Sequence, residues 1–366
     1  MQFINLKKQY KRLESDIDKR IKAVLEHGQF IMGPEIDELE KRLSKFSDSK
    51  YCLSCSSGTD ALLISLLAQG ISSGDKIITT PFTYIATAEV IKLIGATPVF
   101  VDIDSKTFNI DYKKIDIAIN DLKSVKGIIP VNLFGLPADF DAIDDVVSYY
   151  DNIFIIEDAA QSFGAIYKGR KSCSLGDIGA TSFFPAKPLG CYGDGGAIFT
   201  NDDTLAEKIR MIVNHGEKIK YHHEIIGCNS RLDSIQAEIL NIKLKYLDEY
   251  NANRNIMAKN YNLAFAEIDE LLTPKVIDNS EHVFHQYTLR VLNGKRDNFK
   301  TYLSDLGIPS MIYYPIPIHK QKPYKNDQIL ENTDILSDEV ISLPIHTEIE
   351  SSNQDYIIDK ITKYFK

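Results

Sequence analysis

The spacing of the apolar side chains differs between the first 50 residues and the rest of the chain. Over residues 9–27 the apolar side chains stand three or four positions apart among charges, which predicts an amphipathic helix that ends at Gly28. A second helix is expected over residues 33–43, because Pro34 stands near its first turn and acidic residues follow it. This part of the chain is therefore expected to form two helices.

Beyond residue 50, short apolar runs alternate with helical patterns. Strands are expected over residues 51–54, 76–79, 98–102, 128–133, 153–157 and 198–200. Helices are expected over residues 61–68, 84–94, 139–149, 205–213 and 234–250. Repeated strand and helix units predict an α/β fold with a mostly parallel sheet and helices on both faces. Ligands of such folds bind at the carboxyl ends of the strands.

The pattern changes again near residue 250. Segments beyond this point are shorter and more polar, with a strand expected over residues 287–291 and a helix over residues 297–306. We therefore predict a large α/β domain over residues 1–250, including the N-terminal helices, and a smaller α+β domain over residues 251–366.

The composition narrows the class of protein. Of the 366 residues, 44% are hydrophobic and 25% are charged, and no apolar run approaches the roughly 20 residues that a membrane-spanning helix needs. The net charge of −9 and the scattered basic residues argue against nucleic-acid binding. Residues 1–8 lack the pattern of a secretory signal, so a cytoplasmic protein is expected.

Five cysteines form an odd set, which argues against a disulfide framework. Cys52 and Cys55 make a C-x-x-C pattern, which zinc sites and thioredoxin-like redox sites also contain. A second Cys or His pair at metal spacing is not evident in the sequence. We therefore expect no metal site, two partly buried thiols on one strand, and a packing role for Cys191.

Two segments near strand ends suit a phosphorylated aromatic ligand. The turn 57–60 opens an expected helix, where free N–H groups and the helix dipole favour a phosphate, and Gly58 and Thr59 would approach it most closely. An ordinary helix N-cap explains the same turn about as well. Tyr84, rather than Phe82, is the candidate for stacking on a ligand ring, although most aromatic residues pack in a core.

A carboxylate pair closes the apolar strand 153–157. Asp158 at the end of this strand would lie in the crevice of the sheet, where a negative charge is costly without a positive partner. The protonated ring nitrogen of pyridoxal phosphate is such a partner, and Gln161 is spaced to touch the same ring. The alternative is that Glu157 or Asp158 caps the following turn.

One lysine stands in the centre of the apolar and glycine-rich segment 182–196. Burial among Phe183, Phe184 and Leu189 would lower the pKa of Lys187 and leave a free amine for a bond with an aldehyde. A surface lysine in a glycine-rich loop is the alternative. The aldehyde of pyridoxal phosphate would be the reaction partner of a buried amine at this position.

Taken in order, these segments resemble the nucleotide-sugar aminotransferases over nearly the whole chain. The segments that carry the resemblance are residues 57–62, 83–84, 157–161, 182–187 and 192–196. The resemblance implies the fold of the pyridoxal-phosphate transferases of type I, that of aspartate aminotransferase. It also implies that Lys187 forms the Schiff base, that Asp158 pairs with the ring nitrogen, that Gly58, Thr59 and Ser182 bind phosphate, that Tyr84 stacks on the ring and that Gln161 lies against its face or O3′.

The same resemblance implies a homodimer with shared active sites. The segment 227–233 is similar to a loop that crosses to the other subunit, where Asn229 would reach the cofactor phosphate and Arg231 the substrate. The segment 307–321 is similar to the lining of the sugar pocket, which makes Tyr313, Tyr314 and His319 candidate substrate residues. Many relatives carry His where this chain has Tyr313.

The activity that the resemblance implies is transfer of an amino group from L-glutamate to a keto group of a nucleotide-linked sugar. The cofactor would alternate between pyridoxal phosphate and pyridoxamine phosphate, with 2-oxoglutarate as the second product. C3 of a UDP-linked 2-acetamido-3-keto sugar is favoured, for amino sugars of bacterial surface polysaccharides such as O-antigen. The alternatives are amination at C4 of a UDP- or dTDP-4-keto sugar, a pyridoxal-dependent sugar dehydratase, which carries His in place of Lys187, and a cofactor-free binding protein with the same fold.

Overall fold

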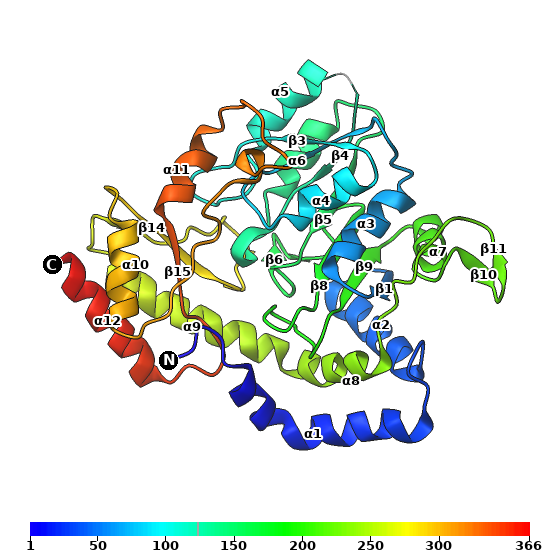
Figure 1. Cartoon of the computed structure of the whole chain (residues 1–366), viewed down its shortest axis with the longest axis horizontal. Helices are drawn as coiled ribbons and strands as arrows, with labels where there is room; N and C mark the ends of the chain where they lie inside the picture. The colour runs from blue at the N-terminus through cyan, green and yellow to red at the C-terminus, as the bar shows by residue number, and fades with distance from the viewer. Residues whose placement is uncertain (123) are drawn as a thin grey trace.

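A seven-stranded sheet forms the centre of the larger part of the molecule (Figure 1). The computed structural model describes residues 1–122 and 124–366. The strands of this sheet are β1 (Tyr51–Cys55), β2 (Lys76–Thr79), β3 (Thr97–Phe100), β4 (Val125–Ile129), β5 (Phe154–Asp158), β8 (Ile178–Ser182) and β9 (Gly196–Thr200). Their order is β1-β9-β8-β5-β4-β2-β3, and β9 runs antiparallel to both of its neighbours. The remaining neighbours in the sheet pair in parallel, which confirms the mostly parallel sheet that the sequence predicts.

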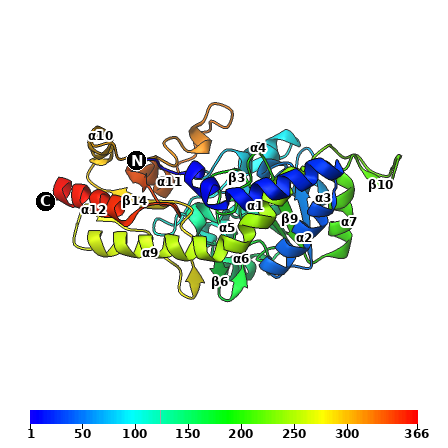
Figure 2. The same ribbon diagram turned by 90° about the horizontal axis from the view of Figure 1, so that it is seen from below.

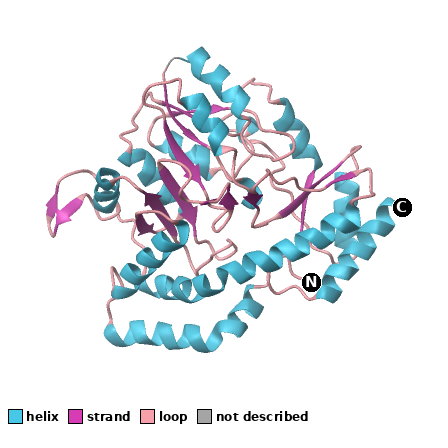
Figure 3. Cartoon of the chain, turned by 180° about the vertical axis from the view of Figure 1, so that it is seen from behind, coloured by secondary structure: helices cyan, strands magenta, loops and turns pink. Residues whose placement is uncertain are grey.

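Helices cover both faces of this sheet (Figure 3). On one face pack α3 (Gly58–Ala68), α4 (Ala86–Leu93) and α7 (Asp203–Ile212). On the other face lie α2 (Pro34–Ser47), α5 (Tyr112–Leu122), α6 (Phe140–Val147) and α8 (Ser234–Lys243), and α1 (Leu6–His27) packs on α8. Alternate side chains of each strand supply the two cores, as the period of a strand requires.

The C-x-x-C pair shows this alternation on β1. Cys52 belongs to the core beneath α2 and α8, whereas Leu53 and Cys55 belong to the core beneath α3. Both thiols are free and buried, and burial raises the pKa of each. The expectation of two buried thiols on a strand is confirmed, and their opposite directions explain why the pair forms no disulfide.

Capping residues define the ends of α1 and the start of α2. The Asn5 side chain accepts a hydrogen bond from the Lys8 N–H at 2.9 Å at the start of α1, and Gly28 ends that helix with a φ of 74°. Pro34 occupies the first turn of α2, where its missing N–H costs no helical hydrogen bond.

The long helix expected over residues 234–250 is not a single helix. A 3₁₀ turn over Leu244–Tyr246 interrupts it after α8, and α9 (Leu247–Phe265) then continues beyond residue 250. In Figure 1 the two helices follow one another along the lower side of the molecule, and α9 extends beneath the C-terminal part. This extension was missed in the sequence because the buried face of α9 includes the polar residues Asn251 and Arg254, which interrupt the apolar pattern.

The C-terminal part has its own antiparallel sheet and its own core. The sheet contains β12 (Leu271–Leu272), β14 (Tyr287–Val291) and β15 (Val340–Leu343), and the helices are α10 (Arg296–Asp305), α11 (Glu331–Glu339) and α12 (Ser351–Phe365). One hydrophobic cluster joins residues from Ala258 to Ile361. We keep residue 250 as the proposed division between two domains, although it lies inside α9, because this separate core supports it.

Smaller elements complete the chain. β10 (Glu217–Ile219) and β11 (His222–His223) form a hairpin that projects from the body beyond α7 (Figure 2). β13 (Ser280–Glu281), β6 (Ile166–Tyr167) and β7 (Arg170–Lys171) form a small sheet, and 3₁₀ turns span Leu133–Gly135 and Ile318–Lys320. Within the described ranges, every helix is too short or too polar to cross a membrane.

Some boundaries differ from the sequence-based expectation, and at least one helix was not predicted. β4 ends at Ile129 rather than at residue 133, because Leu133 already begins a 3₁₀ turn. α4 begins at Ala86, two residues after Tyr84. The helix α5 was not predicted, since its buried face consists of only Ile115 and Ile119 among polar neighbours.

Candidate active site

A cavity of about 720 Å³ lies where the ends of β5 and β8 meet the N-terminus of α3 and the C-terminal part of the chain. It contains most of the residues that the sequence marks as candidates. The candidates that line it are Gly58, Thr59, Tyr84, Asp158, Gln161, Ser182, Lys187, Tyr313 and Tyr314. Asn229, Arg231 and His319 are not among its lining residues.

The N-terminus of α3 presents backbone N–H groups to this cavity. Ser57 caps the helix by accepting the Asp60 N–H at 3.0 Å, and Ser56 and Ser230 donate to the carboxylate of Asp60. The first N–H groups of a helix have no acceptor within it, so those of Gly58 and Thr59 are available to a ligand. A Cβ on Gly58 would stand 2.5 Å from Ser182 Cβ, so glycine is what allows the end of β8 to approach this turn.

Asp158 lies at the end of β5 with its carboxylate in the cavity and only 4% of its surface exposed. Thr87 Oγ1 donates to Oδ2 at 2.8 Å, and the Ala160 N–H donates to Oδ1 at 3.2 Å. Burial raises the pKa of Asp158, and these two hydrogen bonds with the positive charge of Lys187 only partly offset it. A carboxylate buried in this way favours a cationic ligand beside it.

The neighbouring Glu157 faces the opposite side of the strand and has a different role. Its buried carboxylate accepts hydrogen bonds from four groups and so joins the segments on either side of β5. The donors are Asn132 Nδ2 at 2.7 Å, Ser172 Oγ at 2.7 Å, the Cys173 N–H at 2.9 Å and the Leu175 N–H at 3.0 Å. Of the acidic pair, Asp158 alone therefore reaches the cavity.

Gln161 is fixed by hydrogen bonds at both ends of its side chain. Its Oε1 accepts the Phe134 N–H at 2.8 Å, and its Nε2 donates to Tyr314 Oη at 3.3 Å. Phe134 has a φ of 59° within the 3₁₀ turn, which directs its N–H toward Gln161. The amide thus connects the β5 side of the cavity to the segment that contains Tyr313 and Tyr314.

Lys187 follows β8 in a tight turn and is half-buried on the cavity wall. Its N–H donates to Phe184 O at 2.8 Å, which closes the turn. Burial lowers the pKa of Lys187 to about 8, against the opposite effect of the Asp158 carboxylate. The uncharged fraction of this amine near neutral pH is therefore far larger than that of an ordinary lysine, and this form can act as a nucleophile.

The two aromatic candidates after β2 have separate places. Phe82 is fully buried and packs with Phe108, Phe134 and Tyr314. Tyr84 is 59% exposed and lines the cavity. Tyr84 is therefore the aromatic ring that a ligand can reach.

Several cavity residues escaped the sequence analysis. Thr87 bonds the key carboxylate but stands in a helix without any motif, and Phe3, His285 and Gln286 line the cavity from segments far apart in sequence. The Phe3 ring packs edge-on against Tyr313 with centroids 6.4 Å apart. No spacing in the sequence joins these positions, because only the folded chain brings the N-terminal segment and the β14 side together.

Asn229 and Arg231 lie on the segment that follows the β10–β11 hairpin. Asn229 is exposed, and Arg231 Nη1 donates to Asn214 Oδ1 at 2.9 Å. Within one chain neither side chain lines the cavity.

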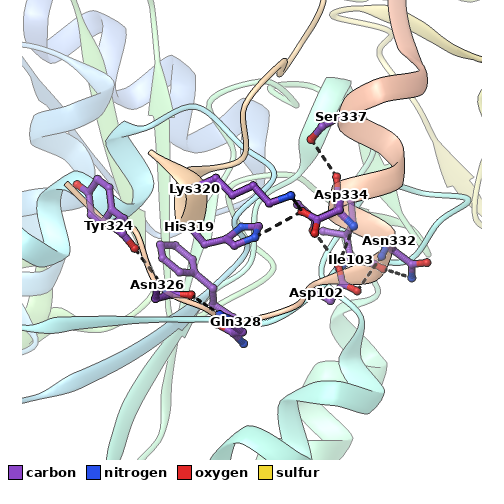
Figure 4. Close-up of polar contacts among 12 residues, drawn as sticks. Asp102, Ile103, His319, Lys320, Tyr324, Asn326, Gln328, Asn332, Asp334 and Ser337 are labelled. Carbon is purple, nitrogen blue, oxygen red and sulfur yellow. Dashed lines mark hydrogen bonds and ion pairs between the residues drawn. The ribbon is translucent and has the colours of Figure 1, made fainter. Parts of the chain in front are cut away.

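The structure places His319 outside the cavity as well. Its side chain is fully buried in the 3₁₀ turn 318–320, with Nε2 3.5 Å from Asp334 Oδ1, while Lys320 Nζ stands 2.6 Å from the same oxygen (Figure 4). Burial lowers the pKa of His319, so the ring is neutral and Lys320 is the charged partner of Asp334. The sequence resemblance predicts that the segment 307–321 reaches the cavity, but it does not predict that the His319 side chain points away from it.

Asp102, two residues after the end of β3, holds the N-terminus of α11. Its carboxylate, 2% exposed, accepts hydrogen bonds from the N-terminus of α11 (Figure 4) and from Lys114 Nζ at 2.9 Å. From α11 come the Asn332 N–H at 3.1 Å, the Thr333 N–H at 2.9 Å and Thr333 Oγ1 at 2.7 Å. Burial alone would raise the pKa of Asp102, but the bonds from Lys114 and Thr333 hold it below its usual value.

These features fit pyridoxal phosphate. The start of α3 suits its phosphate, the buried Asp158 suits a protonated ring nitrogen, and the partly neutral Lys187 suits its aldehyde. The family model for the DegT/DnrJ/EryC1/StrS aminotransferases matches residues 11–362.

The chain belongs to this aminotransferase family.

Similar proteins agree with this membership. The UDP-2-acetamido-2-deoxy-3-oxo-D-glucuronate aminotransferase of Pseudomonas aeruginosa is 47% identical over 363 residues, 99% of each chain. A DegT/DnrJ/EryC1/StrS aminotransferase structure from Brucella abortus has a TM-score of 0.95 and 39% identity, and covers 100% of this chain and 99% of that one. NtdA from Bacillus subtilis, solved with bound cofactor PMP, has a TM-score of 0.90 and 32% identity, over 96% of this chain and 81% of that one.

The expected fold and cofactor class are thereby confirmed. The protein has the architecture of the pyridoxal-phosphate sugar aminotransferases, and pyridoxal phosphate with its pyridoxamine form is the cofactor of this aminotransferase. Lys187, Asp158 and the turn at Gly58 are the groups that would hold it.

Replacing Asp102 with Asn should destabilise the protein by about 2–3 kcal/mol, because a charged acceptor of several buried hydrogen bonds is lost. The measurement is urea unfolding, with Asp16→Asn on the exposed side of α1 as the control. The folded pKa of Asp102 lies below 3.8, so its contribution is complete above that pH and is lost as the pH falls through the folded pKa. The free energies of unfolding of Asp102→Asn and of the unchanged protein should therefore converge in acid. A constant difference between them down to the lowest pH would contradict the assigned role.

The pKa of Lys187 can be read from its reaction with the cofactor. In cofactor-free protein the rate of covalent attachment of pyridoxal phosphate should rise with pH around a midpoint near 8, because only the free amine attacks. Stopped-flow absorbance measures this rate, with Lys187→Ala as the blank. A midpoint near 10.5, the value of an unperturbed lysine, would show that burial does not depress this pKa.

Proposed function

We propose that this protein transfers the amino group of L-glutamate to C3 of a UDP-linked 2-acetamido-3-keto sugar, for amino sugars of bacterial surface polysaccharides. The observation that carries the proposal is the placement of Lys187 and Asp158 in one cavity beside the phosphate-binding turn of α3. The choice of sugar is supported by the similarity to the Pseudomonas aeruginosa aminotransferase, whose name specifies a 3-oxo UDP sugar. Amination at C4 of a UDP- or dTDP-4-keto sugar is the alternative.

Each candidate residue has a defined task in this proposal. When bound, pyridoxal phosphate supplies an aldehyde that bonds reversibly to amines and a ring that accepts electron density. Lys187 Nζ anchors the cofactor, takes the proton from Cα of glutamate and returns a proton to C3 of the sugar in the second half of the cycle. Asp158 keeps a proton on the ring nitrogen.

The remaining candidates would hold and orient the cofactor. The N–H groups of Gly58 and Thr59, with Ser182, would bind the phosphate. Tyr84 would cover one face of the ring, and Gln161, fixed by Phe134 and Tyr314, would lie against the ring or its O3′.

The sugar would be recognised on the side of the C-terminal part. Tyr313 and Tyr314 line the cavity there, and Tyr313 packs against Phe3. His319 would act from behind this wall by supporting the 318–320 turn, since its side chain is fully buried.

The proposed enzyme is a cytoplasmic homodimer with shared sites. Asn229 and Arg231 lie outside the cavity of their own chain, next to a hairpin that projects from the body (Figure 2). This placement supports a role in the site of the partner, with Asn229 on the cofactor phosphate and Arg231 on the substrate.

Mass spectrometry of the products tests the sugar. The protein, loaded with pyridoxal phosphate and ¹⁵N-glutamate, is offered a panel of UDP- and dTDP-linked 3-keto and 4-keto sugars. We expect ¹⁵N only in the product of the UDP 2-acetamido-3-keto sugar. Labelling only from 4-keto sugars would establish the alternative, and a deoxy sugar without nitrogen would establish a dehydratase.

Replacement of Lys187 by Ala should abolish amination and the absorbance of the covalently bound cofactor, because the anchor and the proton carrier are lost together. Borohydride reduction followed by peptide mapping should label Lys187 in the unchanged protein. Lys92→Ala, an exposed lysine on α4, serves as the control. Turnover by Lys187→Ala would overturn the proposal.

A further inference from the structure

A second buried lysine, outside the cavity, contacts the loop that contains Lys187. Lys243 is the last residue of α8 and is 1% exposed. Its Nζ donates to Gly190 O at 2.7 Å and lies 4.3 Å from the centroid of the Tyr192 ring. In the described parts of the chain no carboxylate forms an ion pair with it, and the one charged-group effect on its pKa comes from Cys191. Burial lowers the pKa of Lys243 to about 8, and the carbonyl and the aromatic face are the groups that stabilise its ammonium form.

The bond from Lys243 ends on a residue in contact with the turn of Lys187. A Cβ on Gly190 would stand 2.4 Å from Pro185 O and 2.7 Å from Phe184 O, so the two stretches of chain touch through backbone atoms. Phe184 O is also the acceptor of the Lys187 N–H at 2.8 Å. A shift of Gly190 would therefore displace the peptide that fixes Lys187.

α8 holds the same loop at a second point. Gln236 stands seven residues before Lys243, two helical turns away on the same face, and its Oε1 accepts the Tyr192 N–H at 2.8 Å. Asp194 and Gly195, which follow in sequence, line the cavity. α8 thus holds the loop at Gly190 and Tyr192, just before the loop reaches the cavity wall at Asp194.

We propose that Lys243 is a positioning residue for Lys187: its donor, acting through Gly190, holds the turn that aims Lys187 Nζ into the cavity. Lys243 does not line the cavity, so it touches neither cofactor nor substrate. Packing alone does not require a charge here, because an apolar side chain of similar length would fill the same space without the cost of burying an ammonium. The inference rests on the role proposed above for Lys187.

The test compares Lys243→Met with Lys243→Gln. The two replacements have side chains of equal length, and only Gln can donate to Gly190 O. In Lys243→Met we expect kcat to fall about tenfold or more while KM for glutamate and the sugar changes less than about twofold, since misorientation of the reacting group affects the chemical step. Lys243→Gln should recover a large part of kcat.

A second readout does not depend on turnover. The rate at which pyridoxal phosphate bonds to Lys187 in the cofactor-free protein should fall in Lys243→Met by a factor similar to that for kcat, and recover in Lys243→Gln. Thermal unfolding should differ little between the two variants. Lys245→Met, which removes an exposed lysine two residues away, should leave both rates unchanged.

The outcomes separate this inference from the proposed function. Equal attachment rates and equal kcat in Lys243→Met and the unchanged protein would overturn the inference, as would equal losses in the Met and Gln variants. Were the unchanged protein to aminate no sugar, the proposed function would fail while the attachment rates still decided the role of Lys243. If Lys243→Met did not fold, an attachment rate in Lys243→Gln like that of the unchanged protein would support the inference, and a tenfold lower rate would overturn it.

Discussion

The active cavity depends on keeping an amine and a carboxylate apart inside one low-dielectric space. Burial disfavours both charges: it raises the pKa of Asp158 and lowers that of Lys187 to about 8. An ion pair between them would reverse the shift of the lysine and use the carboxylate that a protonated ring nitrogen needs. Hydrogen bonds from Thr87 and Ala160 hold the acid, and the backbone turn at Phe184 holds the lysine, so each group keeps its own place at the end of its own strand.

Three buried carboxylates differ in the number of hydrogen bonds that they accept, and this number separates structural groups from the group that faces the cavity. Glu157 and Asp102 each accept at least four hydrogen bonds and join segments that are distant in sequence. Asp158 accepts two and faces the cavity. The carboxylates with complete sets of donors fix the walls, and the incompletely satisfied one is left for a ligand.

The sequence predicts the sheet and two residues that meet in the cavity because both depend on local signals. Apolar runs specify the strands, and the residues at their ends, Asp158 and Lys187, belong to short recognisable segments. It does not predict contacts that depend on packing between distant segments. Thr87 and Phe3 belong to no motif, α9 conceals its buried face among polar residues, and His319 lies in the expected segment but points into the protein.

The 3₁₀ turn Leu244–Tyr246 has a mechanical consequence for the cavity. α9 belongs to the core of the C-terminal part through Ala258, Tyr261 and Phe265, whereas α8 packs against the sheet, so the two parts are joined by one nearly continuous helical rod. The junction of that rod lies immediately after Lys243, the residue that bonds the loop of Lys187. The position of the loop that contains Lys187 therefore depends on both cores, because α8 and α9 are anchored in different ones.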